Sequence, residues 1–184
     1  MFEDVNASLA ALLHTAIAKD VAVEFGPVVD GAGAEKRSVV LTFLHIERCV
    51  TGMELDWTDV RDEKGKVVAR MPPTHRYCLH YLVTASAGAT ADLELLGSTL
   101  EVLGSYNAVP RALSRGPLRD STWPVALEVA PAAPLQDTLD IWAALRADPR
   151  PALRLLVTAP MVPAPITSLE ATPEGVTLGA TRKQ

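Results

Sequence analysis

Helical spacing of apolar residues predicts helices in three parts of the chain. In the first, residues 2–17, apolar side chains recur every third or fourth position, and Glu3 and Asp4 fall in the first turn, where carboxylates favour the positive end of the helix dipole. The second, ADLELLGSTLEVLGS, is predicted to carry one apolar stripe made of Leu93, Leu96, Leu100 and Leu103. The third follows Pro134, a residue suited to the first helical position, and repeats at core spacing Leu135, Leu139, Trp142 and Leu145.

Runs of branched and aromatic residues predict β-strands between these helices. We expect strands at residues 21–25 (VAVEF), 37–50 (RSVVLTFLHIERCV), 76–85 and 124–130 (PVALEVA). The tetrapeptide LVTA occurs twice, at the end of strand 76–85 and within residues 150–161 (RPALRLLVTAPM). Because four residues of common strand-forming type do not prove a duplication, we interpret both copies as buried strands of one sheet.

A β-hairpin is predicted between the second and third strands. DEKGK (residues 62–66) is a turn signal that separates MELDWTDV from KVVARM. The following Pro72 and Pro73 must end the pairing, because proline cannot donate a backbone hydrogen bond to a ladder.

The order of the elements favours an α+β fold. Uninterrupted alternation of strands and helices fails in the first half of the chain, so we expect a single domain with a mixed, largely antiparallel sheet, flanking helices and the hairpin. From residue 163 onward the periodic pattern is lost in PAPITSLEATPEGVTLGATRKQ. The predicted organisation is therefore a domain over residues 1–162 and an extended arm over residues 163–184.

Composition and charge exclude several classes of function. The 184 residues are 48% hydrophobic and 21% charged, which is a globular composition. A net charge of −5 is unlike the clustered basic surface of a nucleic-acid-binding protein, and no apolar run approaches the roughly 20 residues of a membrane span. The N-terminus has Glu3 and Asp4 where a signal peptide has basic residues, so we expect synthesis in the cytoplasm.

Searching for catalytic, metal and cofactor motifs yields weak candidates. His45–Cys49 and His75–Cys78 have spacings that resemble a zinc site, but an extended strand holds such pairs apart or on opposite faces. The glycines of GAGAEK and DEKGK lack the remaining residues of phosphate-binding loops. We therefore expect no catalytic, cofactor or metal site. An enzyme with a site assembled from scattered residues, such as His80, Asp92 and Arg76, remains an alternative.

Other residues are candidates for contact with a partner. In PRALSRGPLRD, arginine recurs every fourth residue at Arg111, Arg115 and Arg119, but Gly116 and Pro117 interrupt the spacing, so a continuous basic helix face is not expected. These arginines are either solvated loop residues or part of a patch that docks an acidic partner, with Arg111 and Arg115 as the candidate contact residues. Trp57 lies beside the polar hairpin and is a candidate contact residue.

Several motifs, taken in order, resemble a known family. EDVNASLAALL, the PP before RYCLHYLVTASAG, LELLGSTLEVL, LDIWAAL and RPALRLLVTAP together resemble the tail-terminator, or cap, proteins of extracellular contractile injection systems, which are phage-tail-like particles. The resemblance covers roughly residues 1–162.

The resemblance implies a structural role. It predicts a homohexameric ring on the last layer of the inner tube and sheath, with this chain, the tube protein and the sheath protein as partners, and without nucleic acid, membrane or cofactor. The arm is expected to add as a strand to a neighbouring subunit or to the sheath, with contact residues Ile166, Leu169, Val176 and Leu178. A general adaptor or scaffold domain outside injection systems remains an alternative.

Overall fold

The structure is a computed structural model that describes residues 1–27, 37–49, 56–88, 90–131, 135–161, 163–164 and 166. The chain divides into two compact units. We call Met1–Glu54 with Thr74–Val162 the sheet unit, and Leu55–Pro73 with Pro163–Gln184 the hairpin unit. The predicted arm thus shares a unit with the hairpin, and the boundary after residue 162 stays a prediction.

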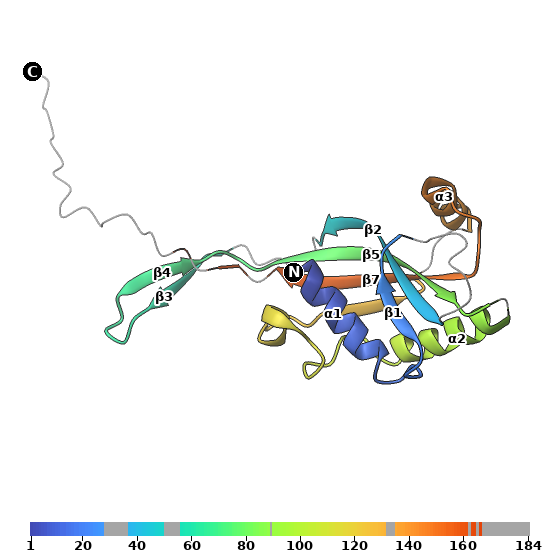
Figure 1. The fold of residues 1–184 in the computed structure, drawn as a ribbon. Coiled ribbons are helices and arrows are strands. Elements are labelled where there is room, and N and C mark those ends of the chain that lie inside the picture. Colours follow the sequence, from blue (N-terminus) through green and yellow to red (C-terminus); the bar gives the residue numbers. More distant parts are fainter. Residues whose placement is uncertain are drawn as a thin grey trace, which may run out of the picture. The chain divides into compact units, whose positions relative to one another are not determined.

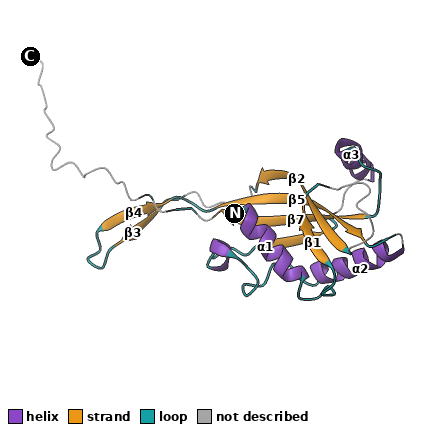
Figure 2. Ribbon diagram, in the orientation of Figure 1, coloured by secondary structure: helices purple, strands orange, loops and turns teal. Residues whose placement is uncertain are grey.

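The sheet unit is built on a five-stranded mixed sheet with the strand order β1-β2-β5-β7-β6 (Figures 1 and 2). Its strands are β1 (Ala22–Phe25), β2 (Ser38–Arg48), β5 (His75–Ser86), β6 (Ala126–Val129) and β7 (Ala152–Met161). β1 pairs parallel to β2, and the other neighbours are antiparallel. The prediction of a mixed, largely antiparallel α+β sheet is therefore confirmed, with β5 and β7, which carry the two LVTA copies, as neighbours.

Helices cover both sides of this sheet. α1 (Phe2–Leu13) and α2 (Thr90–Gly104) lie on one side, and α3 (Leu135–Leu145) lies on the other (Figure 1). A short 3-10 helix, η1 (Gly116–Arg119), packs against α1. Alternate residues of the central strands face α1 and α2 and are almost fully buried: Val39, Leu41, Leu79, Tyr81, Val83, Leu155 and Val157. Burial of each such side chain stabilises the fold by about 1.5–3 kcal/mol.

The first helix is one turn shorter than its apolar stripe predicts. α1 ends at Leu13, and the next residues form a tighter turn in which the amides of Thr15 and Ala16 donate to carbonyls three residues back. Ile17 is nevertheless only 6% exposed, because this turn carries its side chain into the same core. The predicted helix boundary was wrong. The middle of the predicted stripe is buried, whereas Phe2 and Ala16 at its ends are exposed.

The apolar stripe predicted for α2 is partly wrong. Leu93 and Leu100 are 58% and 40% exposed, whereas Leu96 and Leu103 are buried as predicted. The remaining buried positions of this helix are Leu95, Thr99 and Val102. Leucines occur around much of α2, so the sequence alone allows two different apolar faces for this helix. Thr99 can be buried because its hydroxyl donates to the Leu95 carbonyl oxygen at 2.8 Å. In α3, Trp142 is buried as predicted, but Leu139 is 42% exposed.

The hairpin unit contains the predicted hairpin, formed by β3 (Thr58–Arg61) and β4 (Val67–Met71). Its turn is organised by Asp62, whose carboxylate accepts hydrogen bonds from the amides of Lys64 and Lys66 at 2.9 Å each. Gly65 adopts a φ of 78°, a left-handed conformation that glycine reaches without steric cost. β4 ends at Met71, directly before the two prolines, as predicted.

Candidate assembly interface

The hairpin unit carries several exposed apolar side chains. Trp57 is 53% exposed directly before β3, and Val68 is 43% exposed on β4. Ile166, which is also 43% exposed, pairs with β4 through two backbone hydrogen bonds to Arg70, of 3.0 and 2.8 Å. Two of the predicted contact residues, Trp57 and Ile166, thus lie in one unit. The other arm residues, Leu169, Val176 and Leu178, lie outside the described residues.

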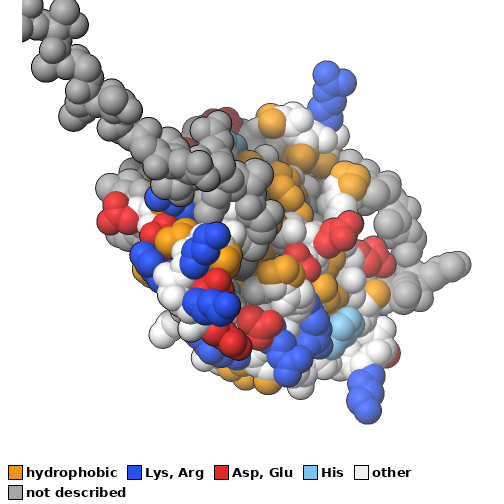
Figure 3. Space-filling view, turned by 90° about the vertical axis from the view of Figure 1, so that its left-hand side faces the viewer, with side chains coloured by type: hydrophobic (Ala, Val, Ile, Leu, Met, Phe, Trp, Pro, Cys, Tyr) orange, Lys and Arg blue, Asp and Glu red, His pale blue; other side chains and the backbone are white. Residues whose placement is uncertain are grey.

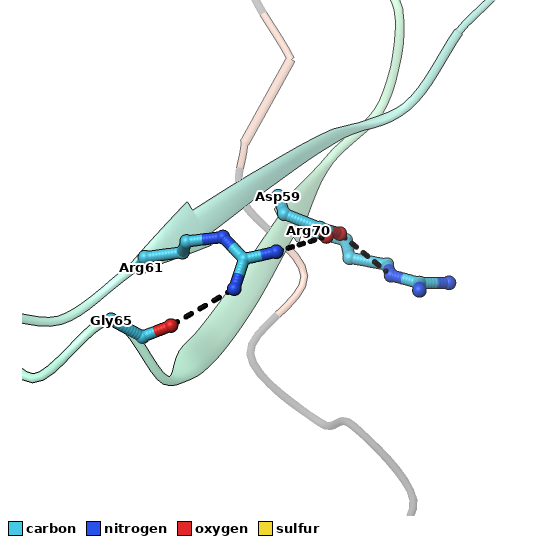
Figure 4. A network of polar contacts seen from close by, with 4 residues as sticks. All are labelled: Asp59, Arg61, Gly65 and Arg70. Carbon is cyan, nitrogen blue, oxygen red and sulfur yellow. Dashed lines mark hydrogen bonds and ion pairs between the residues drawn. The ribbon is translucent and has the colours of Figure 1, made fainter.

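A network of polar contacts links the two strands of the hairpin (Figure 4). Asp59 accepts from Arg61 at 3.4 Å and, across the strands, from Arg70 at 3.1 Å. Arg61 also donates to the carbonyl oxygen of Gly65 at 2.9 Å. Ion pairs this exposed stabilise by only about 0–1 kcal/mol each. The network brings both guanidinium groups to the carboxylate of Asp59 and thereby links β3 to β4.

Arg111 and Arg115 lie on the irregular segment that leads into η1. Arg111 donates to the carbonyl oxygen of Ser121 at 3.2 Å. The Arg115 amide donates to the hydroxyl of Ser8 at 2.9 Å, which fastens this segment to α1. Both residues are exposed and neither belongs to a regular helix. The absence of a continuous basic helix is therefore confirmed for this described stretch, and contact with an acidic partner stays a prediction.

The face drawn in space-filling form mixes charges of both signs. Acidic and basic side chains are interspersed with hydrophobic ones there (Figure 3). Such a surface does not create the extended positive field that attracts nucleic acid. Among the described helices, none is long and apolar enough to cross a membrane.

The residues of the enzyme alternative are not brought together. His80 lies on β5 with its Nε2 3.3 Å from Glu47 Oε1. Asp92 instead accepts hydrogen bonds from the amides of Ala87 and Gly88, and the strand rise puts these amides on the order of 20 Å from His80. Arg76 lies over the ring of Trp123 at 4.5 Å. In the described part of the chain, no group of three or more His, Cys, Asp or Glu residues could hold a metal ion.

Two hollows lie beside the end of β1. One, of about 250 Å³, is lined by Ser38, Thr84, Ser86 and Arg150 among others. The other, of about 430 Å³, is lined by Asn6, Leu41, Phe43, Tyr81 and Leu145 together with residues 25–27. None of His80, Asp92 and Arg76 lines either of them.

An aromatic cluster at the larger hollow was missed by the sequence analysis. Phe2 and Phe43 are each 44% exposed and pack edge to face with their ring centroids 5.6 Å apart. Phe43 makes a second edge-to-face contact with Tyr81, also at 5.6 Å. The Tyr81 hydroxyl donates to Asn6 Oδ1 at 2.9 Å, and burial raises the pKa of Tyr81 to about 12. Phe43 lies in a run of apolar strand residues, and nothing in that run indicated that its side chain would be exposed.

Comparison with solved structures places this fold among proteins that end phage-tail-like tubes. The sheath/tube terminator of PVC, an extracellular contractile injection system, in its extended state has 18% identity and a TM-score of 0.70, with 100% of this chain and 64% of that chain covered. The tube-terminating cap of the anti-feeding prophage has 14% identity and a TM-score of 0.70, with 98% of this chain and 62% of that chain covered. This chain thus spans slightly less than two thirds of either protein.

The sequence itself identifies the family. The family described as the Pvc16 N-terminal domain matches residues 4–174, and the chain belongs to it. The predicted resemblance to tail terminators of contractile injection systems is therefore confirmed. No curated protein matches the sequence.

Proposed function

We propose that this protein is the cap of a contractile injection system: copies of it form a ring on the last layer of the inner tube and sheath, stop tube growth and anchor the sheath. Membership of the Pvc16 N-terminal domain family supports this proposal. The single observation that carries it is the fold shared with two terminators over 100% and 98% of this chain.

The ring is proposed to be a homohexamer that acts without catalysis. Its other partners would be the tube protein and the sheath protein, and synthesis would take place in the cytoplasm before incorporation into the particle. A stiff sheet suits this role, because a ring must present a surface of constant shape to the tube layer below it. The candidate contacts are Trp57 and Ile166 on the hairpin unit, Arg111 and Arg115 beside η1, and the arm residues Leu169, Val176 and Leu178.

Imaging of particles made with and without the chain tests this function. Without it, we expect tubes of uncontrolled length or particles that lack sheath, and re-expression of the chain should restore a narrow length distribution. A matched comparison adds a chain that ends at residue 164, which removes Ile166 and everything after it. We expect this shorter chain to fold but to lose sheath attachment. Particles of unchanged length and sheathing in the absence of the whole chain would contradict the proposal.

A further inference from the structure

The two edges of the five-stranded sheet differ in how they are covered. At one edge, residues 107–109 run along β6, where the Leu127 amide donates to the Asn107 carbonyl oxygen at 2.9 Å and the Val109 amide donates to Val125 at 2.8 Å. Along this stretch, the β6 edge is therefore occupied. At the other edge, β1 pairs only with residues 38–41 of β2, whereas β2 continues to Arg48.

Beyond Leu41, no described residue pairs with the outer side of β2 as a strand. The Gly26 amide adds a last hydrogen bond to the Leu41 carbonyl oxygen at 3.3 Å, and the Thr42 hydroxyl closes the end of β1 by donating to the Gly26 carbonyl oxygen. An unpaired strand edge of this kind is a ready template for a strand from another chain.

The direction of the backbone groups along this edge follows from the pairing with β5. The Cys49 amide donates to the Arg76 carbonyl oxygen at 2.9 Å, so the backbone of Cys49 faces β5. Since amides alternate along a strand, the backbone groups of Ile46 and Arg48 face outward. An added strand could pair with both residues without disturbing any hydrogen bond between β2 and β5.

The side chains next to this edge form an apolar surface. The hollow of about 430 Å³ lies where β1 stops, and Leu41, Phe43 and Tyr81 are among its lining residues. The exposed ring of Phe43 is held by an edge-to-face contact with the exposed ring of Phe2. Clustered, exposed aromatic side chains beside a hollow are the usual anchors of protein interfaces.

The occupant of this edge can be argued from the sequence of the chain. Residues 175–180, GVTLGA, which lie outside the described residues, alternate apolar and small or polar positions, so a strand made from them would direct Val176, Leu178 and Ala180 to one side. Arg182 and Lys183 follow directly. On the acceptor edge, the exposed carboxylate of Glu47 is complementary to these bases, and the neighbouring Arg48 is engaged with His75 at 2.9 Å.

We propose that the outer edge of β2, from Phe43 to Arg48, accepts residues 175–180 of a second copy of this chain as an added strand. The inference rests on the proposed function, because a ring needs contacts between copies, and it names the site of one such contact. Donor segment and acceptor edge are different surfaces, so the contact is head to tail. Repetition of a head-to-tail contact closes a ring when the rotation between neighbouring copies closes on itself, whereas contact between two identical surfaces stops at a dimer.

Titration of a labelled peptide tests the acceptor directly. The probe is a fluorescent peptide of residues 173–184, and the receptor is a chain that ends at Ile166, which retains every described residue. We expect a dissociation constant in the micromolar range. Arg48→Pro should weaken binding about tenfold, because it removes an outward amide while leaving the ladder to β5 intact. Arg48→Ala is the matched control, since it also removes the side chain but keeps the amide, and it should bind within about threefold of the unsubstituted chain.

A second pair of variants tests the donor. The peptide with Leu178→Asp should bind at least about tenfold more weakly, because it places a carboxylate on the apolar side of the added strand. The full chain should then associate at high concentration in sedimentation velocity, and Arg48→Pro should abolish that association while Arg48→Ala preserves it. Circular dichroism of all variants checks that the sheet is folded.

Several outcomes would overturn the inference. One is the absence of peptide binding to the chain that ends at Ile166, and another is equal binding by the Arg48→Pro and Arg48→Ala variants. A full chain that stays monomeric and does not bind the peptide would indicate that the arm pairs with the β2 edge of its own chain. That result would contradict the proposed contact between two copies. Any of these results with normal particle length leaves the cap function standing. Uncontrolled tube growth unaffected by the chain would instead remove the cap function itself.

Discussion

Replacement of Gly116 by alanine tests how the segment with Arg111 and Arg115 is fastened to α1. Gly116 has a φ of 54°, in the left-handed region, and it begins η1. A Cβ atom added there would stand 2.8 Å from the carboxyl carbon of Asp4 on α1. Alanine at this position therefore meets both an unfavourable backbone conformation and a steric conflict.

The expected loss of stability can be estimated from these two effects. The left-handed conformation costs alanine about 1–2 kcal/mol. Displacement of the Asp4 side chain adds a smaller amount, because its carboxylate is partly exposed and can rotate. Stiffening of the unfolded chain offsets about 0.4–1 kcal/mol. We therefore expect Gly116→Ala to lower the free energy of unfolding by about 0.5–2 kcal/mol, which corresponds to about 1–8 °C in Tm for a chain of this size.

Thermal and urea unfolding followed by circular dichroism measure this effect. Gly97→Ala is the matched control, because Gly97 lies inside α2 with no atom within 4 Å of an added Cβ. This control should stabilise the protein by about 0.5–1 kcal/mol. In an Asp4→Ala background, the cost of Gly116→Ala should fall to the backbone contribution alone. A Gly116→Ala variant that is as stable as the parent would refute the described contact between η1 and α1.

Three further predictions address the core and the enzyme alternative. Tyr81→Phe should lower the free energy of unfolding by about 1 kcal/mol at neutral pH by removing the hydrogen bond to Asn6. Because folding raises the pKa of Tyr81 to about 12, the contribution of its neutral hydroxyl to stability is complete below pH 10 and is lost as pH rises to 12. Urea unfolding across this pH range should show a smaller loss of stability in the variant than in the parent. Trp142→Ala should lower the free energy of unfolding by about 3–5 kcal/mol, because this side chain is only 2% exposed. A calorimetric unfolding temperature close to that of the parent would show that Trp142 does not anchor α3. His80→Ala should leave both Tm and capping of particles unchanged, whereas loss of a catalytic activity in that variant would favour the enzyme alternative.

Much of the fold could be predicted because local chemistry decides it. The hairpin was found from DEKGK, and the structure shows why: Asp62 binds two amides of its own turn and Gly65 takes the left-handed conformation. The ends of β4 and the start of β5 followed from the two prolines. The strands β2, β5 and β7 are buried on at least one face, so their branched residues identified them.

The remaining features depend on neighbours that are distant in the sequence. Which leucines of α2 are buried is decided by the strands it packs against, so Leu93 and Leu95 cannot be told apart from spacing alone. The open edge of β2 exists because β1 is only four residues long and pairs with the first part of β2. Arg111 and Arg115 were found as exposed residues, but their attachment to Ser121 and Ser8 required the structure.

Assembly of tubes from purified components tests the central claim most directly. Tube protein polymerises in the presence of increasing amounts of this chain, and tube lengths are measured by electron microscopy. The account predicts that a few copies per tube end arrest elongation, with the chain visible as a ring at that end. Tubes that continue to grow at the same rate, with no copy of the chain at their ends, would contradict it.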